Sequence, residues 1–134
     1  MRFLLLILAL GLALPAQAQS TPSQPGELAS ARRTLDAGVA TNSADSLLAA
    51  RARLSVLASA DDAAGTWASY YAALADYRLA NLFWGSYADR AGQHAASGAS
   101  TLESLRRDDL PDLLQAESAA LLSALYSAQM GLDS

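Results

Sequence analysis

The feature that most constrains the fold is the dominance of Ala and Leu at helical spacing, with few β-branched residues and with Pro confined to the ends of the predicted elements. Ala and Leu have high helix propensity, whereas strands are enriched in β-branched and aromatic residues. The sequence therefore predicts an all-α fold. Because the chain contains no Cys, no disulfide can form, and the fold must rest on burial alone.

The N-terminus has the three parts of a secretory signal peptide. Arg2 supplies a positive charge, an apolar run of 12 residues follows at Phe3–Leu14, and small residues stand at Ala16 and Ala18. We predict cleavage between Ala18 and Gln19, and hence a periplasmic or secreted protein. The alternative is an uncleaved membrane anchor, which is disfavoured because spanning a bilayer takes about 20 apolar residues.

The predicted organisation is a signal peptide over residues 1–18, a flexible spacer over 19–25 and one all-α helical-hairpin domain over 26–134. The spacer is rich in Ser, Thr, Gln and Pro and has little to bury. The remaining length suits a single hydrophobic core. The formal net charge is −4, and loss of Arg2 with the signal makes it more negative. Without Lys and with scattered Arg, the chain is not expected to bind nucleic acid, or a membrane once the signal is removed.

Four or five antiparallel helices are expected from the spacing of apolar residues and from terminal signals. Gly38 is interpreted as the C-cap of the first helix, Asp61-Asp62 as the N-terminal cap of the third, and Gly131 as the stop of the last. The expected ranges are about Glu27–Asp36, from Asn42–Asp45 to Ala60, Ala64–Trp84, from the region after Gly85 to Arg107, and Pro111–Met130.

A faint internal repeat groups these helices into two hairpins. Leu54-x-x-Leu57 precedes Asp61-Asp62 and a long helix, and Leu102-x-x-Leu105 precedes Asp108-Asp109 and another long helix. Two helical hairpins stacked on each other is the simplest architecture with this repeat.

Part of the chain resembles the tetratricopeptide repeats. Ala73-x3-Tyr77-x2-Ala80 is similar to the second-helix pattern of that family, and Tyr126 followed by Leu132-Asp133 is similar to the end of such a repeat. The stretch from Trp67 to Ala80 is also similar to small exported bacterial proteins of tetratricopeptide-like character. The resemblance implies stacked helical hairpins and a non-enzymatic scaffold that holds a peptide or a partner domain in a concave groove.

The third predicted helix carries the candidate binding residues. Aromatic side chains occupy one broad arc, with Arg78 and Asn81 inside it, whereas Ala68, Ala72 and Leu79 lie on a neighbouring arc of mostly small residues. Trp, Tyr and Arg dominate interface energies, so this arc is the expected partner-binding face. The alternative is that the rings are core and that Arg78 extends past them to solvent or pairs with an internal carboxylate. The candidate partner-binding residues are Trp67, Tyr70, Tyr71, Tyr77, Arg78, Asn81 and Trp84.

No motif predicts catalysis, a metal site or a cofactor. His94 is the only His, no Cys accompanies it, and no G-x-S-x-G sequence is present, so we interpret it as a partly buried, hydrogen-bonded side chain. The acidic pairs Asp61-Asp62 and Asp108-Asp109 lack the calcium-loop pattern and stand where helix caps are expected. We therefore expect no enzyme.

The leading hypothesis is an exported interaction module or scaffold that binds a partner protein or peptide through a helical groove. Self-association is a further expectation, because a short helical array leaves apolar ends uncovered. The alternative is a carrier of a small molecule or lipid, with an aromatic-lined pocket between helices. An enzyme that depends on His94 is the weakest hypothesis.

Overall fold

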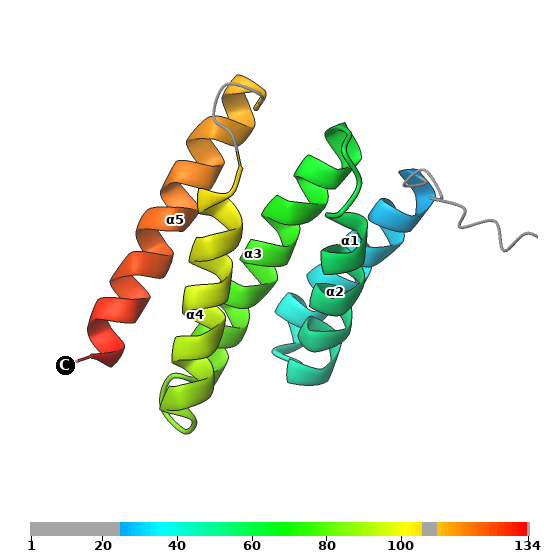
Figure 1. Ribbon diagram of the computed structural model, residues 1–134. Helices are drawn as coiled ribbons and strands as arrows, with labels where there is room; N and C mark the ends of the chain where they lie inside the picture. The colour runs from blue at the N-terminus through cyan, green and yellow to red at the C-terminus, as the bar shows by residue number, and fades with distance from the viewer. Residues whose placement is uncertain (1–24, 106–109, 134) are drawn as a thin grey trace, which may run out of the picture.

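The computed structural model describes residues 25–105 and 110–133, which form five α-helices and no strand (Figure 1). The prediction of an all-α fold is confirmed for these residues. The predicted signal peptide and most of the spacer lie outside the described residues, as do Arg106, Arg107, Asp108 and Asp109. The helices are α1 (Pro25–Thr41), α2 (Ala44–Leu57), α3 (Ala63–Phe83), α4 (Ala88–Glu103) and α5 (Asp112–Leu132).

Successive helices run in opposite directions and each packs on its neighbour in the sequence (Figure 1). In addition, α3 contacts both α1 and α5. This pattern of contacts places α1, α3 and α5 in one layer and α2 and α4 in a second layer. The central helix α3 therefore touches all four other helices, and one of its faces looks outward from the first layer.

The first helix is longer than the sequence indicated, and the prediction that Gly38 caps it is wrong. Helix α1 continues past Gly38 to Thr41, and Asn42 follows it with a positive φ of 49°. Asn tolerates this left-handed conformation better than most residues. A Cβ atom at Gly38 would lie 3.1 Å from side-chain atoms of Leu47, so the glycine permits close approach of α2.

Two predicted helix starts are confirmed by side-chain caps. Ser43 Oγ accepts a hydrogen bond from the backbone N–H of Ser46 at 3.2 Å, at the start of α2. Asp62 Oδ1 accepts one from the backbone N–H of Gly65 at 2.8 Å, at the start of α3. Such bonds satisfy N–H groups that have no partner within the helix.

The end of the last helix differs from the prediction. Helix α5 continues through Gly131 to Leu132, so Gly131 does not stop it. The indole of Trp84 occupies the space that a Cβ atom at Gly131 would need. The glycine therefore serves packing between α5 and the segment that follows α3.

The core follows the predicted apolar spacing and is rich in Ala. One cluster of buried residues joins α1, α2, α3 and the start of α4, and a second joins α3, α4 and α5. The arc of mostly small residues on α3, which includes Ala68, Ala72 and Leu79, is buried, and this lets the helices of the second layer approach α3 closely. The arc of α3 that carries the aromatic residues, Arg78 and Asn81 faces outward and holds the candidate site.

Candidate functional site

Three of the predicted aromatic residues form one cluster in the first half of α3. The rings of Trp67 and Tyr71 are stacked with centroids 5.7 Å apart, and the Tyr70 ring meets Tyr71 at 5.5 Å in an edge arrangement. All three side chains are partly buried. Offset and edge-to-face contacts of this kind hold aromatic rings in a defined position. The cluster is thus a preformed apolar surface.

Trp67 and Tyr71 line a pocket between α1 and α3, here called the aromatic pocket. Its volume is about 520 Å³. The Arg32 guanidinium lies 4.5 Å from the centre of the Tyr71 ring and donates a hydrogen bond to the Tyr71 hydroxyl. Arg33 stands at the same pocket, so an apolar lining is combined with two positive charges. The lining residues are Leu28, Ala29, Arg32, Arg33, Ala63, Ala64, Trp67 and Tyr71.

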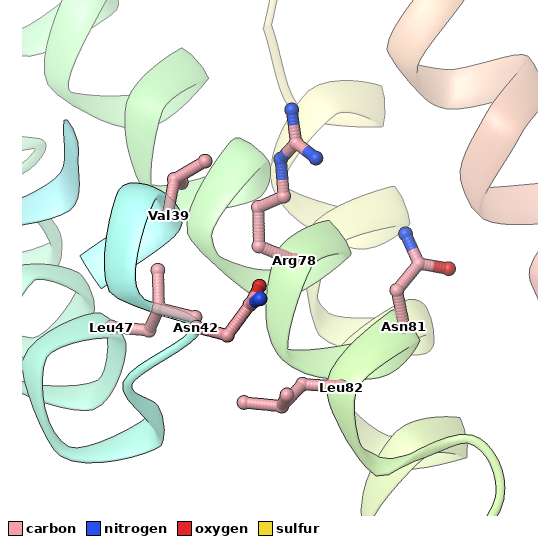
Figure 2. A pocket seen from close by; sticks show the side chains of 6 residues that line it. All are labelled: Val39, Asn42, Leu47, Arg78, Asn81 and Leu82. Atoms are coloured by element: carbon pink, nitrogen blue, oxygen red, sulfur yellow. The ribbon is translucent and has the colours of Figure 1, made fainter. Parts of the chain in front are cut away.

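Arg78 and Asn81 line a different pocket, here called the polar pocket, at the other end of the α1–α3 interface (Figure 2). Its volume is about 320 Å³. Both side chains project from α3, while Asn42 reaches toward it from the turn after α1 (Figure 2). Arg78 is exposed, and its guanidinium lies 6.0 Å from the centre of the Tyr77 ring. The lining residues are Val39, Asn42, Leu47, Arg78, Asn81 and Leu82.

The structure therefore divides the single predicted groove into two pockets on one helix face. Tyr70 and Tyr77 lie in neither pocket and pack against the second core cluster, to which α3, α4 and α5 contribute. Trp84 also lies outside both, where it meets Gly131 of α5. Of the seven predicted residues, the two pockets bring together Trp67 with Tyr71 and Arg78 with Asn81.

The environment of Tyr70 shifts its acidity. Burial raises the pKa of the Tyr70 hydroxyl to about 12, and the nearby Glu117 carboxylate of α5 adds to the shift by repelling the phenolate and by hydrogen bonding. The neutral phenol is therefore the form present at physiological pH. Tyr70 links α3 to α5 at the edge of the outward face.

A buried polar cluster that sequence reasoning missed lies behind this face. The Asp76 carboxylate of α3 is almost fully buried, with 2 % of its side chain exposed. Its Oδ1 accepts hydrogen bonds from Arg51 Nε at 2.5 Å and from His94 Nδ1 at 2.7 Å. Arg51 also donates to Ser97 Oγ at 2.8 Å. One carboxylate thus connects α2, α3 and α4.

The interpretation of His94 as a partly buried, hydrogen-bonded side chain is confirmed. Its side chain is 15 % exposed and its ring stacks on Phe83 at 5.8 Å. Within residues 25–105 and 110–133, no serine hydroxyl hydrogen-bonds to His94 Nε2, and Ser97 is held by Arg51 instead. The contact between Asp76 and His94 Nδ1 fixes the orientation of the imidazole.

The sequence did contain a signal for this cluster. Asp76 stands four residues after Ala72 and three before Leu79, inside the buried stripe of α3. Arg51 has the same relation to Leu47 and Leu54 of α2. A charge at a core position of a helix needs a partner, because burying it unpaired costs several kcal/mol.

Comparison with known proteins gives no match to any protein-family model, curated protein or solved structure. Among the described helices, none is long and apolar enough to cross a membrane. In that same part of the chain, no three His, Asp or Glu side chains are grouped as metal ligands would be.

Proposed function

We propose that this chain is an exported interaction module with tetratricopeptide-like stacked hairpins, and that it binds an extended segment of a partner protein along the outward face of α3. The observation that carries the proposal is the pair of pockets on this face. Each pocket combines apolar side chains with arginine. An apolar patch with a few fixed polar groups is typical of ligand sites.

The charge of the face indicates the chemistry of the segment. The chain as a whole is acidic, with a net charge of −4, yet both pockets contain Arg. Arg32 forms an ion pair with Asp36, in which Nε of Arg32 lies 3.7 Å from Oδ2 of Asp36. For Arg33 and Arg78, no carboxylate of the described residues lies within ion-pair distance. A partner segment that carries carboxylates would supply the missing counter-charges.

The distance between the pockets sets the spacing of the recognised residues. Trp67 and Arg78 are 11 residues apart on one helix, which corresponds to about 17 Å at a rise of 1.5 Å per residue. An extended peptide advances about 3.3 Å per residue. The segment is therefore expected to place an apolar or aromatic side chain in the aromatic pocket and a carboxylate at Arg78 about five residues away.

The alternative is a small-molecule or lipid carrier, and the aromatic pocket is the observation in its favour. Its volume of about 520 Å³ falls in the range of small-molecule sites, roughly 300–1,000 Å³. A carrier needs the aromatic pocket alone, whereas an extended segment needs both pockets. Loss of binding on changing Arg78 therefore separates the two functions.

The test is selection from a random-peptide library with the purified chain, followed by affinity measurement for the enriched peptides. We expect peptides with an apolar residue and acidic residues, and at least a tenfold loss of affinity for Arg33→Glu and for Arg78→Glu. Arg53→Glu is the matched control, since Arg53 is an exposed arginine on α2. Enriched peptides that bind all three variants equally would contradict the proposal.

Fluorescence of Trp67 gives a second readout. The chain has two Trp residues, so Trp84→Phe leaves Trp67 as the only indole. A bound apolar side chain in the aromatic pocket is expected to change the Trp67 emission. A peptide that binds tightly without altering this emission would place its site elsewhere.

Export is tested separately by the mass of the protein recovered from a bacterial host. Cleavage after Ala18 predicts a chain that starts at Gln19 and is found outside the cytoplasm. Recovery of the intact chain from the cytoplasm would contradict the proposed location.

A further inference from the structure

The last helix has an uncovered face with an unusual composition. Helix α5 packs on α4 and α3 through one side. On the other side, six exposed residues without charge follow one another along the helix, and we call them the α5 seam. Its two end residues are large and apolar, with 64 % of Leu113 and 67 % of Met130 exposed. The α5 seam consists of Leu113, Ala116, Ala120, Ser123, Ser127 and Met130.

The spacing within the α5 seam alternates between three and four residues from end to end. This is the a/d spacing of a coiled coil, in which a second helix packs along the stripe. The four central positions hold only Ala and Ser, which let two helix backbones approach closely. An end helix of an array needs a polar outer face to remain uncovered in water. The α5 seam offers only two serine hydroxyls, and that of Ser127 donates to the Ser123 carbonyl oxygen of the same helix.

We propose that the occupant of the α5 seam is α5 of a second copy of this chain, packed antiparallel in a two-fold symmetric dimer. The α5 seam is symmetric about a point between Leu121 and Leu122. An antiparallel copy centred there sets Leu113 against the partner's Met130. The two remaining pairs are also complementary in size, Ala116 with the partner's Ser127 and Ala120 with the partner's Ser123. This is the self-complementarity that a two-fold interface requires.

The charges of α5 select the antiparallel direction. Asp112 and Glu117 are the only charged residues of the helix, and both lie in its first two turns. Glu117 is turned toward Tyr70 of α3, so Asp112 is the charge that flanks the α5 seam. A parallel pair would place Asp112 near its own copy, where like charges repel. The antiparallel pair places Asp112 against the uncharged second half of the partner helix and also opposes the two helix dipoles.

The size of the contact indicates a dimer that depends on concentration. Leu113 and Met130 are 17 residues apart, so the α5 seam extends about 26 Å along the helix. A single helix pair of this length buries less than the roughly 800 Å² per partner of a standard interface. We therefore expect monomer and dimer to exchange rather than a permanent assembly.

The test is the mass of the purified chain in sedimentation equilibrium over a wide range of concentration. The wild type is expected to rise toward twice the monomer mass, and Ala120→Glu to remain at the monomer mass, because it places two carboxylates at the centre of the interface. Ala49→Glu, at an exposed alanine of α2, is the matched control and is expected to dimerise like the wild type. A wild type that remains monomeric throughout, or an Ala120→Glu variant that still dimerises, would overturn the proposal.

Cross-linking tests the direction. Because the chain contains no Cys, each introduced thiol is unique. A mixture of Ala116→Cys and Ser127→Cys chains is expected to form a disulfide-linked dimer between the two kinds of chain. Predominant linkage of Ala116→Cys to itself would show a parallel pair and refute the proposed arrangement.

Discussion

The ion pair between the partly exposed Arg51 and the buried Asp76 allows a quantitative test of the core. Replacement Arg51→Met keeps the aliphatic volume of the side chain and removes its charge. The Asp76 carboxylate, with 2 % of its side chain exposed, then retains only the hydrogen bond from His94. Breaking a buried pair by removing one partner costs about 3–5 kcal/mol. We expect the lower end, about 3 kcal/mol, because the hydrogen bond from His94 remains.

The assay is urea unfolding followed by circular dichroism. With a denaturant slope of about 1.5 kcal/mol per M, a loss of about 3 kcal/mol lowers the midpoint by about 2 M. The control is Arg53→Met, at an exposed position two residues further along α2, which should change the free energy of unfolding by less than about 0.5 kcal/mol.

A second substitution identifies the cause of the loss. Asp76→Asn removes the buried charge while preserving the shape, so the double variant Arg51→Met/Asp76→Asn should be about 2 kcal/mol more stable than Arg51→Met alone. The reasoning would be refuted if Arg51→Met and Arg53→Met cost the same, or if the double variant recovered nothing.

The structure gives four further expected outcomes. Gly92→Ala should raise the free energy of unfolding by about 0.5–1 kcal/mol through helix propensity, since the new Cβ meets nothing nearer than 3.9 Å. Gly65→Ala should lower the free energy of unfolding, because its Cβ would overlap the carbonyl oxygen of Ala60. Thermal melts of the two variants check both outcomes. Asp62→Ala should cost about 1 kcal/mol in the same assay, because α3 loses its N-cap. Because the pKa of Tyr70 is raised from 10.0 to about 12, the contribution of this group to stability should be constant below pH 10 and fall between pH 10 and about 12. In urea titrations at these pH values, Tyr70→Phe should lose that part of the fall. An unchanged pH profile in the variant would contradict the prediction.

Which face of each helix is buried could be predicted, because it depends on the spacing of apolar residues within that one helix. Leu47 and Leu54 of α2 and Leu114 and Leu125 of α5 recur at helical spacing in the sequence, and all four are buried. The N-terminal caps at Ser43 and Asp62 were equally local, since each side chain bonds a backbone group three residues away. Local rules decide such features before tertiary packing is known.

The interior glycines could not be assigned in the same way. Gly38 and Gly131 both stand near the end of an apolar pattern, where a cap is the usual interpretation. Their actual roles depend on neighbours in other elements, which are Leu47 of the next helix for Gly38 and the Trp84 ring for Gly131. The apolar pattern around a glycine does not by itself distinguish a glycine that ends a helix from one that admits a neighbouring side chain.

The candidate site was half predictable for a related reason. Projection around α3 correctly placed Trp67, Tyr71 and Arg78 on one arc, but it ignores distance along the axis, which separates them into two pockets. The partners of Asp76 are Arg51 and His94, which are 25 and 18 residues away in the sequence. They contact Asp76 only when α2 and α4 are packed on α3 in the orientation of the folded chain. Pairing across helices therefore required the assembled structure.

The packing of each helix mainly on its sequence neighbours has a kinetic consequence. Most contacts in the core join helices that are neighbours in the sequence. Helical proteins with such local contacts fold in microseconds to milliseconds. The same arrangement loosens the two ends, because α1 and α5 each have partners on only one side whereas α3 touches all the other helices. Opening should therefore spread inward from the terminal helices, and the amide hydrogens of α3 should be the last to exchange with solvent.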